Sequence, residues 1–512
     1  MDDYSFMHMD YFFRFNFIIL SVIPILLILS FNVGEIPLND IILPLIVSVT
    51  VAGITFLILK LKFGSNKSGL IISLFLITYI IYGNFQAYVN DILKIDSIFT
   101  SGLFLVPIFL LISLFSIYMI IRKNFYNEFN KIFTVFSITL VIILIPNIFV
   151  FYSDESSYDS NSNLNLDLDI KMSDKPNIFL LIADEYAGTI QLDSDFNYFP
   201  KNLYDELEIR NFKIVKNAIS NYPNTAFSVA SFLNMDYLDF IPKIVGEQSK
   251  SMLYTYDIRS DNLVMKIFKE NGYKVFSYYA GMGAVGTSTN VDAKLCAPFN
   301  INNDLKQKYF QKFIPFTFLN NALLHNPMIE KLDCIENSIK SFDESGQPIF
   351  AMIQIRLPHD PYTFDSQGNV NEVLHSAGTP ESKSAYFEQL LYSEKVFLDI
   401  IDNIQINNPN SVILFISDHG WREEIDWENR DNENTIRGHN VIITAFLPDS
   451  DYEFPERFSL VNLFRLVFNQ YSNTEIELLD DRTIWYSGSQ PNIHYDTTEQ
   501  LLPFIENYKL KN

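Results

Sequence analysis

The chain has 512 residues, with 37 Lys and Arg side chains against 60 Asp and Glu side chains, which gives a formal net charge of −23. Residues 1–151 carry as many basic as acidic residues, so the whole negative surplus lies in residues 152–512. A domain this acidic repels a nucleic-acid backbone, and the sequence holds no basic stripe or glycine-rich phosphate loop to offset the repulsion. We therefore expect no nucleic-acid partner.

Five apolar stretches in the N-terminal part are long enough to cross a bilayer, which takes about 20 helical residues. They occupy residues 15–33, 41–59, 68–89, 103–121 and 132–152, and no charged residue interrupts them. A helix buried in a soluble protein rarely stays apolar on every face for this length. The pattern predicts a five-helix transmembrane bundle over residues 1–151.

Basic residues in the loops of this bundle predict its orientation. They cluster between the second and third stretches and between the fourth and fifth, at Lys60, Lys62, Lys67, Arg122, Lys123 and Lys131. By the positive-inside rule these loops and the N-terminus are cytoplasmic. Five spans then place the acidic half outside the cytoplasm, after a solvated linker at residues 152–174 that is rich in Ser, Asn and Asp.

Strand and helix signals alternate through residues 175–512. The continuous apolar run at 176–185 predicts a strand buried on both faces, and further strands are expected at residues 212–215, 273–279, 347–355, 411–416 and 441–447. Helices are expected at 262–271 and 382–404. This alternation predicts an α/β domain with a mainly parallel central sheet. Cys296 and Cys334 fall in this half, where a disulfide could form, although spacing alone does not show that they pair.

A polar loop with a single hydroxyl precedes the apolar segment 226–235. Pro223 disfavours helix in the preceding residue, and Asn224 is a good N-cap, so a helix is expected to begin at Thr225 or Ala226. The free N–H groups of its first turn favour an anion at Thr225. The simpler alternative is that Thr225 and Ser228 only cap a buried helix.

Acids and histidines follow the predicted strands, where ligands gather in open α/β sheets. Asp184 and Glu185 end the first strand, and Asp418 and His419 end the strand at 411–416. Two more histidines lie at strand edges: His359 stands between two prolines after the strand at 347–355, and His439 ends an Arg-Gly-His sequence before the last strand. Such a set fits the nitrogen and oxygen ligands of a catalytic zinc or manganese site.

These segments occur in an order that resembles the alkaline phosphatase and sulfatase superfamily over residues 176 to about 470. The resemblance is to its membrane-anchored bacterial branch of phosphoethanolamine transferases, lipoteichoic acid synthases and sulfatase-like hydrolases. It implies that Thr225 is the nucleophile and that one or two divalent ions bind. The implied metal ligands are Glu185 as first choice, its neighbour Asp184, Thr225, Asp418 and His419. His359 and His439 would then bind the substrate anion or a second metal.

The resemblance has departures that bear on function. Sulfatases mature a Cys or Ser within Cys/Ser-x-Pro-x-Arg, and the nearest match, at residues 296–300, lacks the Arg and lies far past the nucleophile loop. We therefore expect a membrane-bound enzyme that transfers a phospho-alcohol head group, of phosphoethanolamine or phosphoglycerol type, through a phospho-threonine to an envelope glycan or lipid. The alternatives are a membrane-tethered phosphatase, phosphodiesterase or sulfuric-ester hydrolase, and a non-enzymatic membrane scaffold with a vestigial site.

Overall fold

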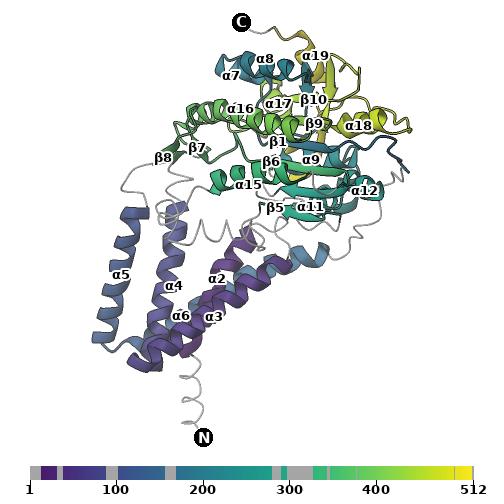
Figure 1. Cartoon of the computed structure of the whole chain (residues 1–512). Coiled ribbons are helices and arrows are strands. Elements are labelled where there is room, and N and C mark those ends of the chain that lie inside the picture. The colour runs from purple at the N-terminus through teal and green to yellow at the C-terminus, as the bar shows by residue number, and fades with distance from the viewer. Residues whose placement is uncertain are drawn as a thin grey trace. The chain divides into compact units, whose positions relative to one another are not determined.

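The computed structural model describes residues 13–31, 38–87, 102–155, 169–278, 290–296, 327–342, 346–375, 377–488 and 490–509. These residues form two compact units, a helical one within residues 1–157 and an α/β one in the remainder (Figure 1). The expected linker lies largely outside the described residues, because α6 ends at Glu155 and the next described residue is Asp169.

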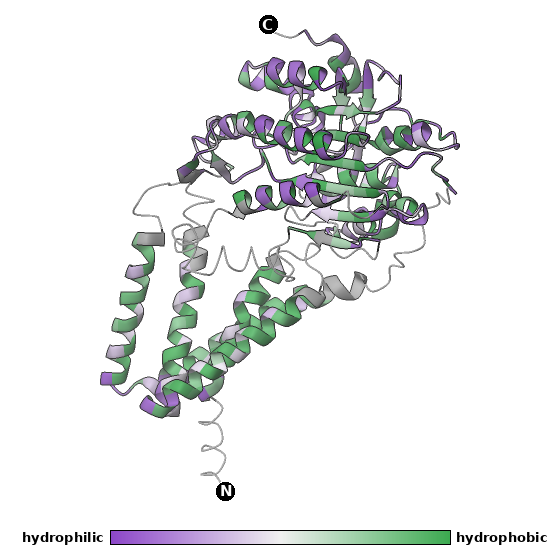
Figure 2. Ribbon diagram, in the orientation of Figure 1, coloured by the Kyte–Doolittle hydropathy of each residue, from purple (hydrophilic) through white to green (hydrophobic). Residues whose placement is uncertain are grey.

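The described residues of the helical unit form a short 3-10 turn and five α-helices. They are η1 (Phe13–Phe15), α2 (Asn16–Phe31), α3 (Leu38–Phe63), α4 (Ser65–Ala87), α5 (Gly102–Arg122) and α6 (Tyr126–Glu155). Figure 2 shows that hydrophobic residues predominate along these helices. In the described part of the chain, α3 to α6 are long and apolar enough to cross a membrane. The protein is thus a multi-pass membrane protein.

The first expected span is shorter in the structure than in the prediction. Helix α2 has 16 residues, or about 24 Å at 1.5 Å per residue, against about 30 Å for the bilayer core. Residues 32–37, which would extend it, lie outside the described residues. That α2 crosses the membrane therefore remains a prediction.

Buried polar side chains join three of these helices. Asn16 of α2 donates from Nδ2 to the carbonyl oxygen of Asn130 on α6, at 3.1 Å. Ser73 of α4 donates from Oγ to Oδ1 of Asn16, at 2.7 Å. In a lipid environment each polar group needs a partner within the protein, so these contacts favour association of α2, α4 and α6.

The described residues of the α/β unit form a seven-stranded sheet in the order β2-β10-β9-β1-β6-β4-β5. Its strands are β1 (Ile178–Ala183), β2 (Lys213–Ile214), β4 (Lys274–Tyr278), β5 (Ala293–Leu295), β6 (Ile349–Ile355), β9 (Val412–Ser417) and β10 (Ile443–Phe446). Pairing is parallel from β9 through β1, β6 and β4 to β5, and β10 runs antiparallel to both β9 and β2. The expected mainly parallel sheet is confirmed.

Helices cover both faces of this sheet. The described helices of the α/β unit are α7 (Thr189–Phe196), α8 (Lys201–Ile209), α9 (Thr225–Asn234), α10 (Ile241–Val245), α11 (Leu253–Ser260), α12 (Leu263–Glu270), α15 (Pro327–Ser341), α16 (Ser382–Asn407), α17 (Asn432–His439), α18 (Leu463–Tyr471) and α19 (Thr498–Asn507), with the 3-10 turn η4 (Leu460–Asn462). Three strand pairs lie outside the sheet: β3 (Asn217–Ile219) with β11 (Arg457–Ser459), β7 (Tyr362–Phe364) with β8 (Val370–His375), and β12 (Ile484–Ser487) with β13 (Gln490–Asp496).

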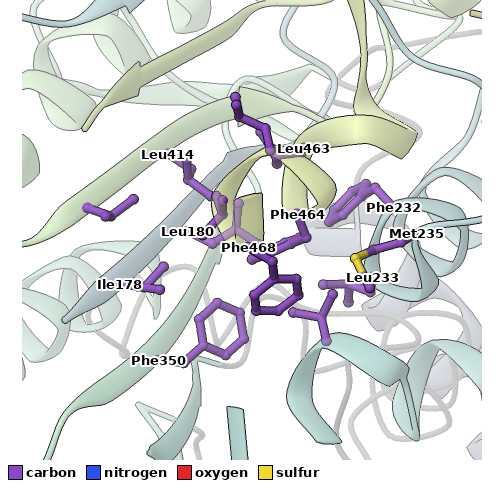
Figure 3. Close-up of a cluster of buried hydrophobic side chains, with 14 of the residues drawn as sticks. Ile178, Leu180, Phe232, Leu233, Met235, Phe350, Leu414, Leu463, Phe464 and Phe468 are labelled. Carbon is purple, nitrogen blue, oxygen red and sulfur yellow. The ribbon is translucent and has the colours of Figure 1, made fainter. Parts of the chain in front are cut away.

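The alternation of β1 side chains divides the core into two layers. Ile178, Leu180 and Ile182 pack in one hydrophobic cluster, and Phe179 and Leu181 pack in another. In the first cluster, residues of α9 and α18 such as Phe232 and Phe464 lie against the sheet (Figure 3). Burial on both faces explains why the strands are continuous apolar runs.

The two cysteines, whose pairing the sequence left open, form a disulfide. Cys296 follows β5 and Cys334 lies in α15, with their Cα atoms 5.7 Å apart. The bond therefore ties an edge of the sheet to a helix beside it.

Candidate active site

Strand register brings the predicted acids to one edge of the sheet. Ala183 at the end of β1 pairs with Ile355 of β6 on one side and with Ser417 of β9 on the other. The three strands are parallel and end level, so the residues that follow them share one edge. Asp184 and Asp418 are the next residues of β1 and β9.

The expected helix at the nucleophile loop is confirmed. Helix α9 begins at Thr225, and its N-cap Asn224 accepts a hydrogen bond at Oδ1 from the backbone N–H of Phe227, at 2.9 Å. Asn224 also donates from Nδ2 to the hydroxyl of Tyr486, at 2.8 Å. These two hydrogen bonds of Asn224 fix the first turn of α9 and so the position of Thr225. Oγ1 of Thr225 lies 3.1 Å from Nε2 of His419.

A first group of possible metal ligands consists of Asp184, Asp418 and His419. All three are buried, and one ligand atom from each lies within 4.8 Å of the others. Nε2 of His419 is 3.8 Å from Oδ1 of Asp184 and 3.5 Å from Oδ2 of Asp418. Among the described residues, neither of these two buried carboxylate oxygens has a hydrogen-bond partner. Unpartnered buried oxygens beside an imidazole nitrogen fit a divalent cation.

The protonation of this group also suits a cation. Nδ1 of His419 lies 2.8 Å from the carbonyl oxygen of Gly420, so it carries the proton and leaves a lone pair on Nε2. Burial, with a contribution from the charge of Arg422, holds the pKa of His419 well below its usual value. Burial and the nearby Asp184 carboxylate raise the pKa of Asp418. A divalent cation would relieve the repulsion between these two carboxylates.

A second group consists of Glu185, His359 and Asp360. The backbone N–H of Glu185 donates to Oδ1 of Asp418, at 3.2 Å, which joins the two groups. The side chain of Glu185 contacts Arg422. Oε1 of Glu185 accepts hydrogen bonds from the backbone N–H of Arg422 at 3.1 Å and from its Nε at 3.4 Å. Oε2 lies 3.8 Å from Nε2 of His359.

The imidazole of His359 is fixed by its neighbour Asp360. Nδ1 lies 2.8 Å from the carbonyl oxygen of Asp360 and 2.9 Å from its Oδ1, so this nitrogen carries a proton. The 3.3 Å contact from Nε of Arg356 to the same nitrogen is therefore not a hydrogen bond in that state. Burial opposes the charged form, but the Glu185 and Asp184 carboxylates and the Asp360 hydrogen bond outweigh it and raise the pKa of His359 to about 9.

The sequence of the α/β unit matches a known family. A sequence model of the sulfatase family, described as "Sulfatase", matches residues 176–440, which is more than half of the chain. The chain belongs to the sulfatase family. No curated protein matches the chain.

Solved structures similar to this sulfatase-family protein have low sequence identity to it. The C-terminal periplasmic domain of EcEptC from Escherichia coli is 15% identical, with 65% of this chain and 96% of that domain covered at a TM-score of 0.42. The same domain in complex with Zn is 13% identical, with the same coverage and a TM-score of 0.43. The integral membrane protein lipooligosaccharide phosphoethanolamine transferase A from Neisseria meningitidis is 12% identical, with 90% and 94% covered at a TM-score of 0.38.

Within this sulfatase-family site the predicted residues fall into two groups. Thr225, Asp418 and His419 lie together. Asp184, which the sequence ranked second, is the acid that joins them, and Glu185 belongs to the other group with His359. A left-handed backbone at Glu185, with φ of 68°, turns the chain after β1. Such a conformation is uncommon for a residue other than glycine, and the sequence gives no sign of it.

His439 belongs to neither group. It ends α17, is fully buried, and has Nδ1 2.8 Å from the carbonyl oxygen of Ser220. Burial lowers its pKa to about 4. Its Nε2 has no hydrogen-bond partner among the residues that the structure describes. A substrate-binding role for His439 remains a prediction.

Three further residues of the sulfatase-family site were not predicted: Asp360, Arg356 and Arg422. Asp360 adjoins the predicted His359, so its proximity was the only available signal. Arg356 follows β6 directly, and Arg422 lies three residues after His419, but neither belongs to a motif with a known spacing. Their positions depend on tertiary contacts.

Proposed function

We propose that the protein is a membrane-bound, metal-dependent transferase that moves a phospho-alcohol head group, of phosphoethanolamine or phosphoglycerol type, from a lipid to an envelope glycan or lipid. The observation that carries this proposal is the position of Thr225, the first residue of α9. Its Oγ1 lies 3.1 Å from Nε2 of His419, and that nitrogen lies 3.8 Å and 3.5 Å from unpartnered oxygens of Asp184 and Asp418. This combination supports Thr225 as the residue that forms a phospho-threonine.

The same contacts suggest which residues hold an ion. Asp184, Asp418 and His419 would supply two oxygens and one nitrogen, and the Thr225 hydroxyl would complete a four-ligand set of the kind zinc prefers. A bound divalent ion would lower the pKa of the hydroxyl and neutralise charge on phosphoryl oxygens. Glu185 is the alternative acid, because it follows Asp184 directly, but its side chain is engaged by Arg422.

The proposed transfer has two steps. Oγ1 of Thr225 bonds to phosphorus, the bond from phosphorus to the donor lipid oxygen breaks, and the proton of the hydroxyl goes to that oxygen. The hydroxyl of the acceptor then bonds to phosphorus, the bond to Oγ1 breaks, and Thr225 recovers a proton. The N–H groups at the start of α9 favour the negative charge of the phosphoryl group in both steps.

Two structural features support a lipid substrate and a location outside the cytoplasm. The apolar helices α3 to α6 anchor the chain in a membrane, where a lipid donor is available. The disulfide between Cys296 and Cys334 is typical of oxidising compartments. The disulfide also disfavours sulfate-ester hydrolysis, because it occupies the one cysteine whose surroundings partly resemble a sulfatase maturation sequence.

A phosphodiesterase or phosphatase would use the same residues with water as acceptor, so the experiment has to measure transfer and hydrolysis together. Thr225→Ala, Thr225→Ser and Ser228→Ala would be assayed in membranes with a lipid phosphodiester and with a chromogenic phosphodiester. We expect Thr225→Ala to fold, retain its ion and lose activity by several orders of magnitude. Thr225→Ser retains part of the activity because its hydroxyl can still be activated.

Ser228 provides the matched control in the same helix. Its hydroxyl accepts a hydrogen bond from Ser220 at 3.0 Å and is buried, so Ser228→Ala should cost about 1 kcal/mol of stability and little activity. Intact-mass analysis of wild type with donor lipid should show a phosphoryl adduct that Thr225→Ala lacks. Near-normal turnover of Thr225→Ala on every substrate that wild type accepts would contradict the mechanism. Release of product only to water would favour the phosphodiesterase.

A further inference from the structure

The two groups of carboxylates differ in the cations that surround them. Within the described residues, neither Asp184 nor Asp418 forms an ion pair with a lysine or an arginine. In the second group Glu185 is paired with Arg422, and Oδ1 of Asp360 lies 3.9 Å from Nη2 of Arg356. Two fixed positive charges therefore balance two carboxylates there, before any charge on His359 is counted. Of the two groups, only the first lacks positive charge to balance its carboxylates, and a divalent ion would supply it.

Arg422 uses only part of its hydrogen-bonding capacity in this arrangement. Its Nε donates to Oε1 of Glu185, at 3.4 Å, and the backbone N–H donates to the same oxygen. The terminal nitrogens Nη1 and Nη2 donate to none of the described groups, and 22% of the side chain is exposed. A guanidinium with both terminal nitrogens available as donors can form two parallel hydrogen bonds to oxygens of a phosphate group.

Arg422 is also linked to the first group, through Glu185. It follows His419 by three residues, and it contacts Glu185, whose backbone N–H donates to Oδ1 of Asp418 at 3.2 Å. The charge of Arg422 also acts on Asp184 and Asp418. An anion held by Arg422 would thus lie beside Glu185, the residue that contacts the first group.

We propose that Arg422, supported by Arg356, makes the second group an anion subsite instead of a second metal site, so that the guanidinium of Arg422 binds non-bridging oxygens of the phosphoryl group. This proposal rests on the proposed function and assigns a substrate-binding residue to it. One divalent ion then binds per chain, in the first group. Glu185 serves to orient Arg422, and the alternative is that Arg422 only neutralises Glu185.

The experiment uses the full chain in detergent, saturated with Mn²⁺ or Zn²⁺, with bound ion measured by elemental analysis and inorganic phosphate binding measured by calorimetry. We expect one ion per wild-type chain. Arg422→Gln should keep that ion and bind phosphate at least about tenfold more weakly, because a charged hydrogen bond is lost. Arg422→Lys keeps the positive charge but loses the paired donors, so its phosphate affinity should lie between those of wild type and Arg422→Gln.

Arg210 provides the matched control. Its side chain is 18% exposed and bonds Asp402 through Nε, as Arg422 bonds Glu185, but it is the C-cap of α8 and its ion-pair partners, Asp402 and Glu206, are not site residues. Arg210→Gln should leave phosphate affinity and ion content unchanged. The double variant Glu185→Gln with Arg422→Gln should bind phosphate as weakly as Arg422→Gln does. Recovery of affinity in the double variant would mean that Arg422 only neutralises Glu185 and would overturn the proposal.

Two other results would overturn it: phosphate affinity unchanged in Arg422→Gln, or a second ion in wild type that Glu185→Gln removes. These outcomes are separable from failure of the proposed function. A wild-type chain that binds no ion at saturation contradicts the metal-dependent transferase, and a phosphate affinity that still depends on Arg422 would leave the anion subsite standing. A chain with one ion and no dependence on Arg422 contradicts only the inference made here.

Discussion

Gln389 donates a hydrogen bond of 3.0 Å from Nε2 to the carbonyl oxygen of His359. The same nitrogen donates to the carbonyl oxygen of Pro358, also at 3.0 Å, and Oε1 accepts from the backbone N–H of Thr363, at 2.7 Å. Gln389 lies in α16 and is fully buried. Both ends of its amide therefore hold the loop that carries His359.

The same helix also holds the turn after β1. Tyr386, three residues before Gln389 in α16, donates from its hydroxyl to the carbonyl oxygen of Glu185, at 2.9 Å, and accepts from the backbone N–H of Ala187, at 3.0 Å. Residues three apart lie on one face of a helix. One face of α16 thus positions both loops of the second group.

Gln389→Met should weaken this support without changing side-chain length. It leaves several buried backbone groups without a partner, each at about 1–3 kcal/mol, so we expect a loss of a few kcal/mol in stability and a lower kcat/KM. Gln405→Met on the same helix is the control, because Gln405 donates one hydrogen bond to the carbonyl oxygen of Arg210, away from the site. Thermal unfolding and steady-state kinetics measure both. Equal losses of activity in the two variants would argue against a positioning role for Gln389.

Replacing each acid after β1 separately tests which one binds the ion. Asp184→Asn should reduce ion content to that of Asp418→Asn, because each change removes a charged ligand from the first group. Glu185→Gln should retain the ion and affect activity through Arg422. Elemental analysis of the purified variants measures the result. Loss of the ion in Glu185→Gln but not in Asp184→Asn would restore the ranking that the sequence favoured.

The sequence predicted the fold and the edge of the sheet better than the arrangement at that edge. Apolar runs determine strands such as β1 and β9, and parallel register brings the residues after them together, so Asp184 and Asp418 could be predicted as neighbours. Capping preferences likewise placed Thr225 at the start of α9. These are local or periodic signals, which the sequence contains directly.

The remaining features depend on conformations with no such signal. The roles of Asp184 and Glu185 are separated by a left-handed residue, and the contact of Arg422 with Glu185 joins residues 237 positions apart. The position of His439 depends on α17, which ends in the Arg-Gly-His sequence; that sequence was expected before the last strand, but the helix was not predicted. Tertiary packing decides each of these features.

The orientation in the membrane can be tested with reporters. A phosphatase reporter that is active only outside the cytoplasm should be inactive after Lys123 and active after Asp174, because the basic residues of the loop between α5 and α6 favour the cytoplasm. If α3 to α6 all cross the membrane, the chain crosses it four times between the start of α3 and the α/β unit. Both then lie on the same side, so an external α/β unit places the start of α3 outside as well. A cytoplasmic N-terminus then requires α2 to cross. An N-terminal tag that is accessible from outside would show that α2 does not, and the reverse reporter pattern would overturn the external assignment.

Glu394 gives the α/β unit a stability that depends on pH. It lies in α16, is buried, and accepts hydrogen bonds from the hydroxyls of Tyr186 at 2.8 Å and Tyr198 at 3.2 Å. Burial raises its pKa from 4.5 to about 7, although the two tyrosine hydrogen bonds lower it. Because the folded chain holds this proton more tightly than the unfolded chain, its contribution to stability is complete below pH 4.5. That contribution is lost as the pH rises through 7.

Glu394→Gln should remove this dependence, since glutamine resembles the protonated acid. One pKa unit corresponds to about 1.4 kcal/mol, so the variant should gain up to about 3 kcal/mol over wild type at pH 8 and nothing comparable at pH 4.5. All three tryptophans of the chain, Trp421, Trp427 and Trp485, lie in the α/β unit, so their fluorescence follows its unfolding by denaturant. Glu388→Gln, at an exposed position of the same helix, is the control and should show no such difference between the two pH values. A Glu394→Gln variant whose stability changes with pH in parallel with wild type would show that Glu394 is already ionised in the folded chain below pH 7.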